Sequence, residues 1–316
     1  MNTIANLLLK RLGISLVTLL LVSAVVFLIT NLLPGDPVQE MLGQAATPEV
    51  VEALRAKLGL NQPAYIRYMN WLGSLLSGDP GVSLANNMPV AELVSDRLPR
   101  SLILAGITTL VAVPFALFVG ILAASYSDTR VDHFISTIIM FVVAIPEFLV
   151  ATIAVLIFSV HLGWLSAVSY APQDPTLQEF IATYALPVMT LSLVLVGQMS
   201  RMTRAALIEQ MQQPYVEMAI LKGASQSRLV LRHALPNAVG PIANAVALSL
   251  SYLMGGVVIV EVIFNYPGIA SLMVDSVTNR DFPLLQACAM LFCTGYLVLV
   301  FMADICAILS NPKLRN

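Results

Sequence analysis

The chain has 316 residues, of which 58% are hydrophobic and only 11% are charged, and its net charge is −2. Ordinary globular proteins carry about 25% charged residues, so this composition could not give two soluble domains a water-compatible surface. The near-neutral balance argues against nucleic acid as a partner, and the high hydrophobicity excludes intrinsic disorder. The lipid bilayer is the remaining solvent, so the composition predicts an all-α, multi-pass membrane protein.

Six apolar runs along the chain are candidates for transmembrane helices, which need about 20 residues to cross the hydrocarbon. The first run follows Lys10 and Arg11. It is longer than the roughly 15 apolar residues of a signal peptide, so we expect an uncleaved span. Glu147 interrupts the third run, and Asp304 interrupts the sixth. The six runs cover residues 12–35, 101–127, 133–161, 183–200, 237–260 and 284–309.

The distribution of lysine and arginine predicts that both termini are cytoplasmic. With the N-terminus inside, the short outer loops hold only Arg280, whereas the cytoplasmic segments hold ten basic residues. The long segment between the first two spans is left out of the comparison, because long segments translocate largely regardless of charge. The cytoplasmic residues are Lys10, Arg11, Arg130, Arg201, Arg204, Lys222, Arg228, Arg232, Lys313 and Arg315.

Two hydrophilic segments separate the spans. Residues 33–99 predict a small extracytoplasmic subdomain, with a helix that Gly59 stops and with turn signals at Gly78-Asp-Pro-Gly81. Residues 201–236 form the longest cytoplasmic stretch, with the pattern helix, break, helix. We therefore expect a first segment and span at 1–32, the subdomain at 33–99, a five-helix core at 100–311 that contains the 201–236 loop, and a cytoplasmic tail at 312–316.

The residues of the 201–236 loop allow two interpretations. Gly223 either ends a helix or lets another backbone approach closely. A basic amphipathic helix after it would lie on anionic headgroups, with Arg228 and Arg232 as anchors. Alternatively, the loop docks a cytoplasmic partner, since the small residues Ala219 and Gly223 suit close approach better than insertion into a membrane.

The loop resembles the EAA loop of permease subunits from bacterial ATP-binding-cassette (ABC) importers. That pattern reads Glu-Ala-Ala, three residues, Gly, nine residues, then Ile-x-Leu-Pro. The chain departs from it at Met218 and at His233, which stand where Ala and Ile are usual. The matching residues are Glu217, Ala219, Gly223, Leu235 and Pro236.

Further motifs in the same order resemble the dipeptide/oligopeptide/nickel branch of these permeases along nearly the whole chain. The long first outer segment is typical of the first, B-type member of a permease pair. The resemblance implies a type I ABC importer permease fold with six transmembrane helices. The motifs are Leu33-Pro-Gly-Asp-Pro37, Leu58-Gly-Leu-Asn-Gln-Pro-Ala-Tyr65, Gly78-Asp-Pro-Gly-Val-Ser83, Val260-Glu-Val-Ile-Phe-Asn-Tyr-Pro-Gly268, and the tail from Asp304 to Pro312, in which Asn311 departs from the usual Asp.

No GxxxxGK[ST] motif occurs, so the chain has no P-loop for ATP, and we expect a non-catalytic subunit. The resemblance implies four kinds of partner: a second permease, two cytoplasmic ATPases that bind ATP and Mg, an extracytoplasmic solute-binding protein and the inner-membrane lipid. It implies that Glu217 faces the ATPase, that Gly223 allows the adjacent turn, and that Arg228 and Arg232 anchor the loop to lipid or ATPase. Di- and oligopeptides are the leading substrates; nickel chelates, glutathione, opines and oligosaccharides use similar permeases.

Three acidic residues fall inside the predicted spans, where charge is costly and usually functional. Glu147, beside Pro146, either lines the pathway and contacts a peptide amino group or is a structural residue at a helix break. For Glu261 we favour a structural or gating role over substrate contact, and for Asp304 a contact between helices or subunits. A stand-alone secondary transporter is the alternative from a different class, although the chain lacks a convincing internal repeat.

The cysteines and histidines predict no metal or cofactor site. Cys288, Cys293 and Cys306 form no CxxC pair and are expected to pack as small apolar residues. The three histidines, His133, His161 and His233, are far apart and lack the spacing of zinc ligands.

Overall fold

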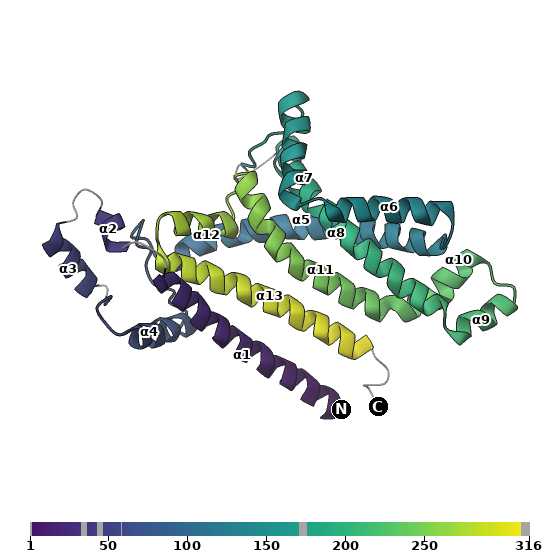
Figure 1. The fold of residues 1–316 in the computed structure, drawn as a ribbon, viewed down its shortest axis with the longest axis horizontal. Coiled ribbons are helices and arrows are strands. Elements are labelled where there is room, and N and C mark those ends of the chain that lie inside the picture. The colour runs from purple at the N-terminus through teal and green to yellow at the C-terminus, as the bar shows by residue number, and fades with distance from the viewer. Residues whose placement is uncertain (1, 33–36, 43–46, 58, 171–175, 311–316) are drawn as a thin grey trace. The chain divides into compact units, whose positions relative to one another are not determined.

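The computed structural model describes residues 2–32, 37–42, 47–57, 59–170 and 176–310. Most of these residues are helical, as the sequence predicts, and they form no strand beyond an isolated bridge between Val82 and Pro89. The helices (Figure 1) are α1 (Asn2–Leu32), α2 (Pro37–Leu42), α3 (Pro48–Lys57), α4 (Ala64–Leu76), α5 (Val90–Ser125), α6 (Arg130–Ala144), α7 (Glu147–Ala154), the π-helix η2 (Val155–His161), α8 (Leu177–Met211), α9 (Pro214–Leu221), α10 (Gln226–Arg228), the π-helix η3 (Leu229–Ala234), α11 (Leu235–Ile263), α12 (Ile269–Thr278) and α13 (Phe282–Ser310).

Five of the described helices are long and apolar enough to cross a membrane, and the bent pair of α6 with α7–η2 brings the number up to six. Several helices exceed the predicted spans, and α5 and α8 are clear examples. α5 begins at Val90, inside the segment predicted as subdomain, and α8 extends on both sides of the predicted 183–200. The charged residues near their ends lie outside a hydrocarbon-length window but do not stop a helix, so hydropathy alone underestimates these lengths.

The third predicted span is sharply bent. α6 and α7 meet at an angle of 94°, and Figure 1 shows α7 turning away from α6. The residue before the proline, Ile145, has extended backbone angles (φ −83°, ψ 126°). A residue before proline is driven out of the α region, and Pro146 itself offers no N–H, so Ile145 and Pro146 explain the bend.

The described residues form two compact units. Unit 1 comprises the described parts of 1–13, 103–266 and 296–316, and unit 2 those of 14–102 and 267–295. The helices α1, α5 and α13 contribute a segment to each unit. The predicted subdomain 33–99 therefore shares unit 2 with α12 and with parts of α1, α5 and α13. The predicted tail 312–316 with Lys313 and Arg315, together with motif residues 33–36, 58 and 311, lies outside the described residues.

Unit 1 is built around α8 and α11, which pack side by side, with α5 and α7 completing its apolar core. Unit 2 has its own cluster, in which Val90, Ile269, Leu272 and Leu284 surround the buried Cys288. All three cysteines are free, and Cys288 packs as the apolar residue that the sequence predicts.

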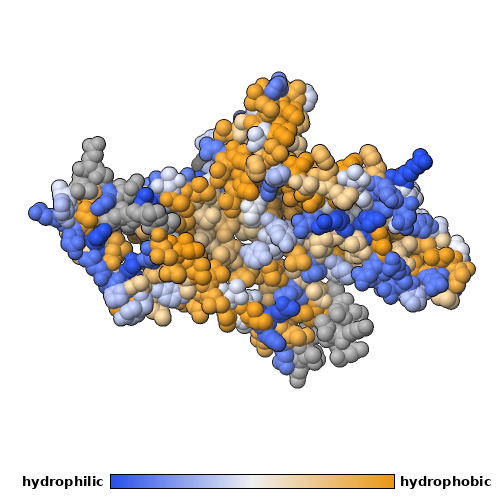
Figure 2. Space-filling model, in the orientation of Figure 1, coloured by the Kyte–Doolittle hydropathy of each residue, from blue (hydrophilic) through white to orange (hydrophobic). Residues whose placement is uncertain are grey.

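Much of the outer surface of the helices is apolar. Large side chains such as Leu110 and Phe118 of α5 are 77% and 62% exposed. Figure 2 shows hydrophobic residues over much of the helical surface in that view. A soluble protein rarely exposes so much contiguous apolar surface, whereas a bilayer is the solvent that such a surface requires.

Candidate functional site

The 201–236 loop has a small apolar core of its own. α9 turns Val216 and Ala219 inward against Leu229 of η3, and Met211 and Ala224 pack beside them. Figure 1 shows α9 and α10 beyond the adjoining ends of α8 and α11. This cluster packs α9 against η3, the π-helix that directly precedes α11. The short helix α9 is therefore held in place although it lies outside the main core.

Gly223 ends α9. It has a left-handed φ of +78°; its N–H donates to the carbonyl of Ile220 at 2.8 Å, and the N–H of Ala224 donates to the carbonyl of Ala219 at 3.1 Å. This pair of bonds is a Schellman motif, which favours glycine at the left-handed position. A Cβ added at Gly223 would meet no atom within 4 Å. Its backbone conformation, not close approach, therefore requires glycine there.

The outward face of α9 differs from the one expected from the sequence. Ala219 is only 7% exposed, so the small residue faces the loop's own core. The exposed residues include Met218 (55%), Ile220 (52%) and Leu221 (76%), with Glu217 beside them. A short helix outside the spans thus presents an apolar surface, which is typical of a docking site.

The remaining loop residues lie in or beside one continuous helical run. Residues Gln226–Ile263 join α10, η3 and α11 without a break. Pro236 is the second residue of α11 and comes directly after the π-helix η3, and such a local π-helical adjustment is one way in which a helix accommodates a proline. Leu235 packs against the cluster around Ala234 and Ala238. Arg228 and Arg232 are exposed and make no ion pair with any residue that the structure describes.

An ion pair that the sequence did not reveal joins α6 to α8. Arg204 donates from Nε to Oδ1 of Asp132 at 2.7 Å and from Nη2 to Oδ2 at 2.6 Å. Asp132 is 2% exposed, and its carboxylate also accepts the N–H of Asp128 and the hydroxyl of Ser136. Bidentate charge-assisted pairs of this kind are strong and directional.

The three membrane-depth acids lie in different surroundings. Glu147 is the first residue of α7, and a Cβ added at Gly256 of α11 would lie 2.6 Å from its Oε1. That buried Oε1 has no hydrogen-bond partner among the described residues. Glu261 is fully buried in α11. Asp304 of α13 forms an ion pair with Arg11 of α1 at 3.3 Å, which is a contact between helices.

Comparison with known proteins gives the family. Residues 116–316 match the model described as "Binding-protein-dependent transport system inner membrane component", and residues 4–105 match the model of the N-terminal part of such components. The chain belongs to this family. The glutathione transport system permease protein GsiC of Escherichia coli (strain K12) is 34% identical to this permease over 98% of this chain and 99% of its own. The "Probable peptide ABC transporter permease protein y4tP" of Sinorhizobium fredii (strain NBRC 101917 / NGR234) is 32% identical over 97% and 98%.

Family membership and the apolar helices make the chain a multi-pass inner-membrane permease component of a bacterial binding-protein-dependent transport system. Such a component works with other subunits of its system. Within the described residues of this permease, no group of three or more His, Cys, Asp or Glu side chains is arranged to hold a metal ion.

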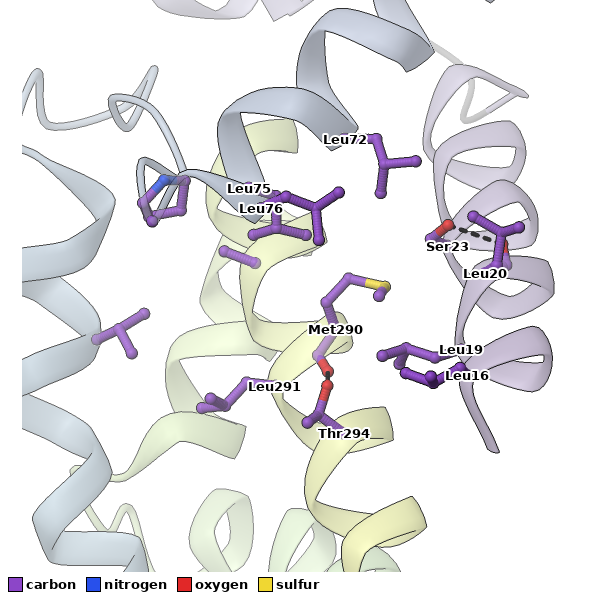
Figure 3. A pocket seen from close by; sticks show the side chains of 14 residues that line it. Leu16, Leu19, Leu20, Ser23, Leu72, Leu75, Leu76, Met290, Leu291 and Thr294 are labelled. Carbon is purple, nitrogen blue, oxygen red and sulfur yellow. Dashed lines mark hydrogen bonds between the residues drawn. The ribbon is translucent and has the colours of Figure 1, made fainter. Parts of the chain in front are cut away.

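Unit 2 of the permease contains an apolar cavity of about 470 Å³, lined by residues of α1, α4, α5 and α13 (Figure 3). Its hydroxyl-bearing residues already bond within the protein: Ser23 bonds to the carbonyl of Leu20 and to Tyr68, and Thr294 to the carbonyl of Met290. A peptide's charged ends would find no partner among these side chains, and burying them unpaired is costly. The cavity therefore does not suit a hydrophilic peptide.

Proposed function

We propose that the chain is the first, B-type permease of a pair in an ATP-driven importer of di- or oligopeptides, and that it forms half of the translocation pathway. The names of the relatives support this substrate class, because they include a glutathione and a peptide permease. Glutathione is itself a tripeptide and stands next in order. Nickel chelates, opines and oligosaccharides are the further alternatives, and much of the selection is made by the solute-binding protein.

The proposed topology is that of a type I importer permease, with both termini cytoplasmic and residues 33–99 facing the solute-binding protein. Two observations support it. Basic residues concentrate on the segments assigned to the cytoplasm. The Arg11–Asp304 ion pair joins α1 near the N-terminus to α13 near the C-terminus, as expected when both termini lie on one side of the membrane.

The observation that carries the coupling proposal is the outward face of α9. Met218, Ile220 and Leu221 are exposed on a helix whose other face is fixed by Val216 and Ala219. The proposed occupant of this face is one of two cytoplasmic ATPases, which bind the ATP and Mg and hydrolyse ATP. Glu217 lies at the same surface and would contact ATPase side chains, while Arg228 and Arg232 hold the loop to lipid or to the ATPase.

A pathway role is proposed for Glu147. Its Oε1 is buried without a hydrogen-bond partner among the described residues, in a segment where the main chain bends by 94°. Peptides carry a cationic amino group, and a carboxylate is the group that would recognise it. Glu261, which is fully buried, is assigned a structural or gating role.

The experiment is ATP-driven uptake by the complete complex in proteoliposomes, with its solute-binding protein and with labelled dipeptide, oligopeptide or glutathione supplied outside. Uptake that needs ATP, both permeases and the binding protein is expected, and competition among the peptides identifies the class. Peptide uptake by this chain alone, driven by an ion gradient without ATPases, would instead establish a secondary transporter.

A further inference from the structure

We propose that Asp132 and Arg204 are positioning residues for transport: their ion pair makes α6, and with it the bend at Glu147, follow the movement of the ATPase-docking loop. This inference rests on the proposed function, since it concerns how a movement that starts at α9 reaches the pathway. It assigns a role to a buried pair that neither substrate nor ATPase needs to touch.

The first step is the link from α9 to α8. α8 ends at Met211, α9 begins at Pro214, and Met211 packs against the Val216–Ala219–Leu229 cluster. A displacement of α9 is therefore passed to the end of α8. Arg204 lies within the last two turns of that helix, close to where the displacement enters.

The second step is the ion pair that connects α8 to α6. The Asp132 carboxylate accepts four hydrogen bonds: two from Arg204, one from the N–H of Asp128 and one from Ser136. These bonds connect three parts of the structure: the turn that precedes α6, the first turn of α6, and α8. The carboxylate is buried and the guanidinium only partly exposed, so solvent and salt weaken the pair little.

The third step is the passage from α6 to Glu147. α6 also packs tightly on α8 farther along, where a Cβ added at Gly197 would lie 2.7 Å from Cγ2 of Val143. Because α6 contacts α8 both at Asp132 and at Val143, the two helices move together as one rigid body. Its far end is the bend, and Glu147 on the other side of the bend contacts Gly256 of α11. The geometry thus provides a continuous path of packed groups from α9 to the α7–α11 contact.

The test compares transported peptide per ATP hydrolysed in the reconstituted complex. Asp132→Asn keeps the side chain's shape but removes its charge, and Arg204→Lys keeps the charge but loses the two-pronged bond. We expect the ratio of uptake to hydrolysis to fall about tenfold in Asp132→Asn and by a smaller factor in Arg204→Lys, within the roughly 5–150-fold range of coupling between sites. The matched controls Arg130→Gln of α6 and Arg201→Gln of α8 change exposed charged residues near the pair and should keep the wild-type ratio.

A purely structural role predicts a different result, in which the amount of assembled complex falls but the surviving complexes keep the wild-type ratio. That result, or an equal fall in the controls, overturns the inference. If Asp132→Asn does not assemble, Arg204→Lys decides, and an unchanged ratio there also overturns it. Failure of the proposed function is distinguishable, because then the wild-type complex itself would show no ATP-driven uptake.

Discussion

α5 and α8 approach each other closely at Gly120, and the structure predicts a clear loss of stability when this residue is enlarged. A Cβ added at Gly120 would lie 2.7 Å from Cβ of Thr203 and 2.8 Å from the backbone oxygen of Ser200. Neither atom lies at the end of a flexible side chain, so Gly120→Ala must push the two helices apart. Small residues permit such close helix packing in membranes. Gly106 of the same helix has no atom within 4 Å of the corresponding position and supplies the matched control.

The magnitude follows from two opposing effects. Overpacking costs about 1–3 kcal/mol, and contacts with a backbone oxygen and a branched carbon favour the upper end. Replacing glycine by alanine inside a helix gains about 1 kcal/mol. Gly120→Ala should therefore lose about 2 kcal/mol net, roughly a 25-fold change in the unfolding equilibrium, whereas Gly106→Ala should gain up to about 1 kcal/mol.

The assay is thermal unfolding of the detergent-purified permease complex, followed by size-exclusion chromatography of the heated samples. The expected decrease in Tm for Gly120→Ala is about 4 °C, with no decrease for Gly106→Ala. If Gly120→Ala melts at or above the temperature of Gly106→Ala, α5 and α8 do not pack in the way described.

Three further substitutions test other parts of the molecule. Gly223→Asp adds a charged side chain to the turn that ends α9, in a left-handed conformation that costs a non-glycine residue up to about 1–2 kcal/mol. It should abolish uptake and transport-coupled ATP hydrolysis while the complex still assembles, and normal uptake in vesicles would contradict the role of α9. Glu147→Gln keeps the volume against Gly256 but removes the charge, so affinity for peptides with a free amino terminus should fall; unchanged affinity and uptake across about pH 5–8, where a free carboxyl is normally ionised, would exclude the pathway role. The buried carboxylate of Asp281 accepts hydrogen bonds from the hydroxyl of Ser83 and from the N–H groups of Leu84, Ala85 and Leu284. Asp281→Asn replaces this carboxylate by a neutral amide and should destabilise unit 2 by about 1.5–3 kcal/mol. An equal decrease in Tm for the exposed Asp275→Asn would refute that reasoning.

Composition and local motifs were sufficient to predict the helical membrane class, the number of spans to within one, and the end of α9 at Gly223. These features depend on residues that are close together in the sequence. Helix lengths were predicted less well, because charged residues such as Arg201 and Glu179 end a hydropathy window without ending α8.

Orientation of side chains and long-range pairing were not predictable from the sequence. Ala219 was expected on the docking face, but the helical phase of α9 turns it inward with Val216. The Asp132–Arg204 pair joins residues 72 positions apart on different helices, so no local pattern of residues predicts their pairing. Its one local signal is Thr129, which accepts the N–H of Asp132 as the N-cap of α6.

Site-specific photo-crosslinking tests the central claim, that α9 docks on an ATPase, most directly. A photoreactive residue replaces Leu221 of α9, which is 76% exposed, and in a matched variant it replaces Leu110 of α5, which is 77% exposed. In the purified complex, position 221 should form a covalent adduct with an ATPase subunit and position 110 should not. An intact complex that gives no ATPase adduct at position 221, or equal adducts at both positions, would contradict the claim.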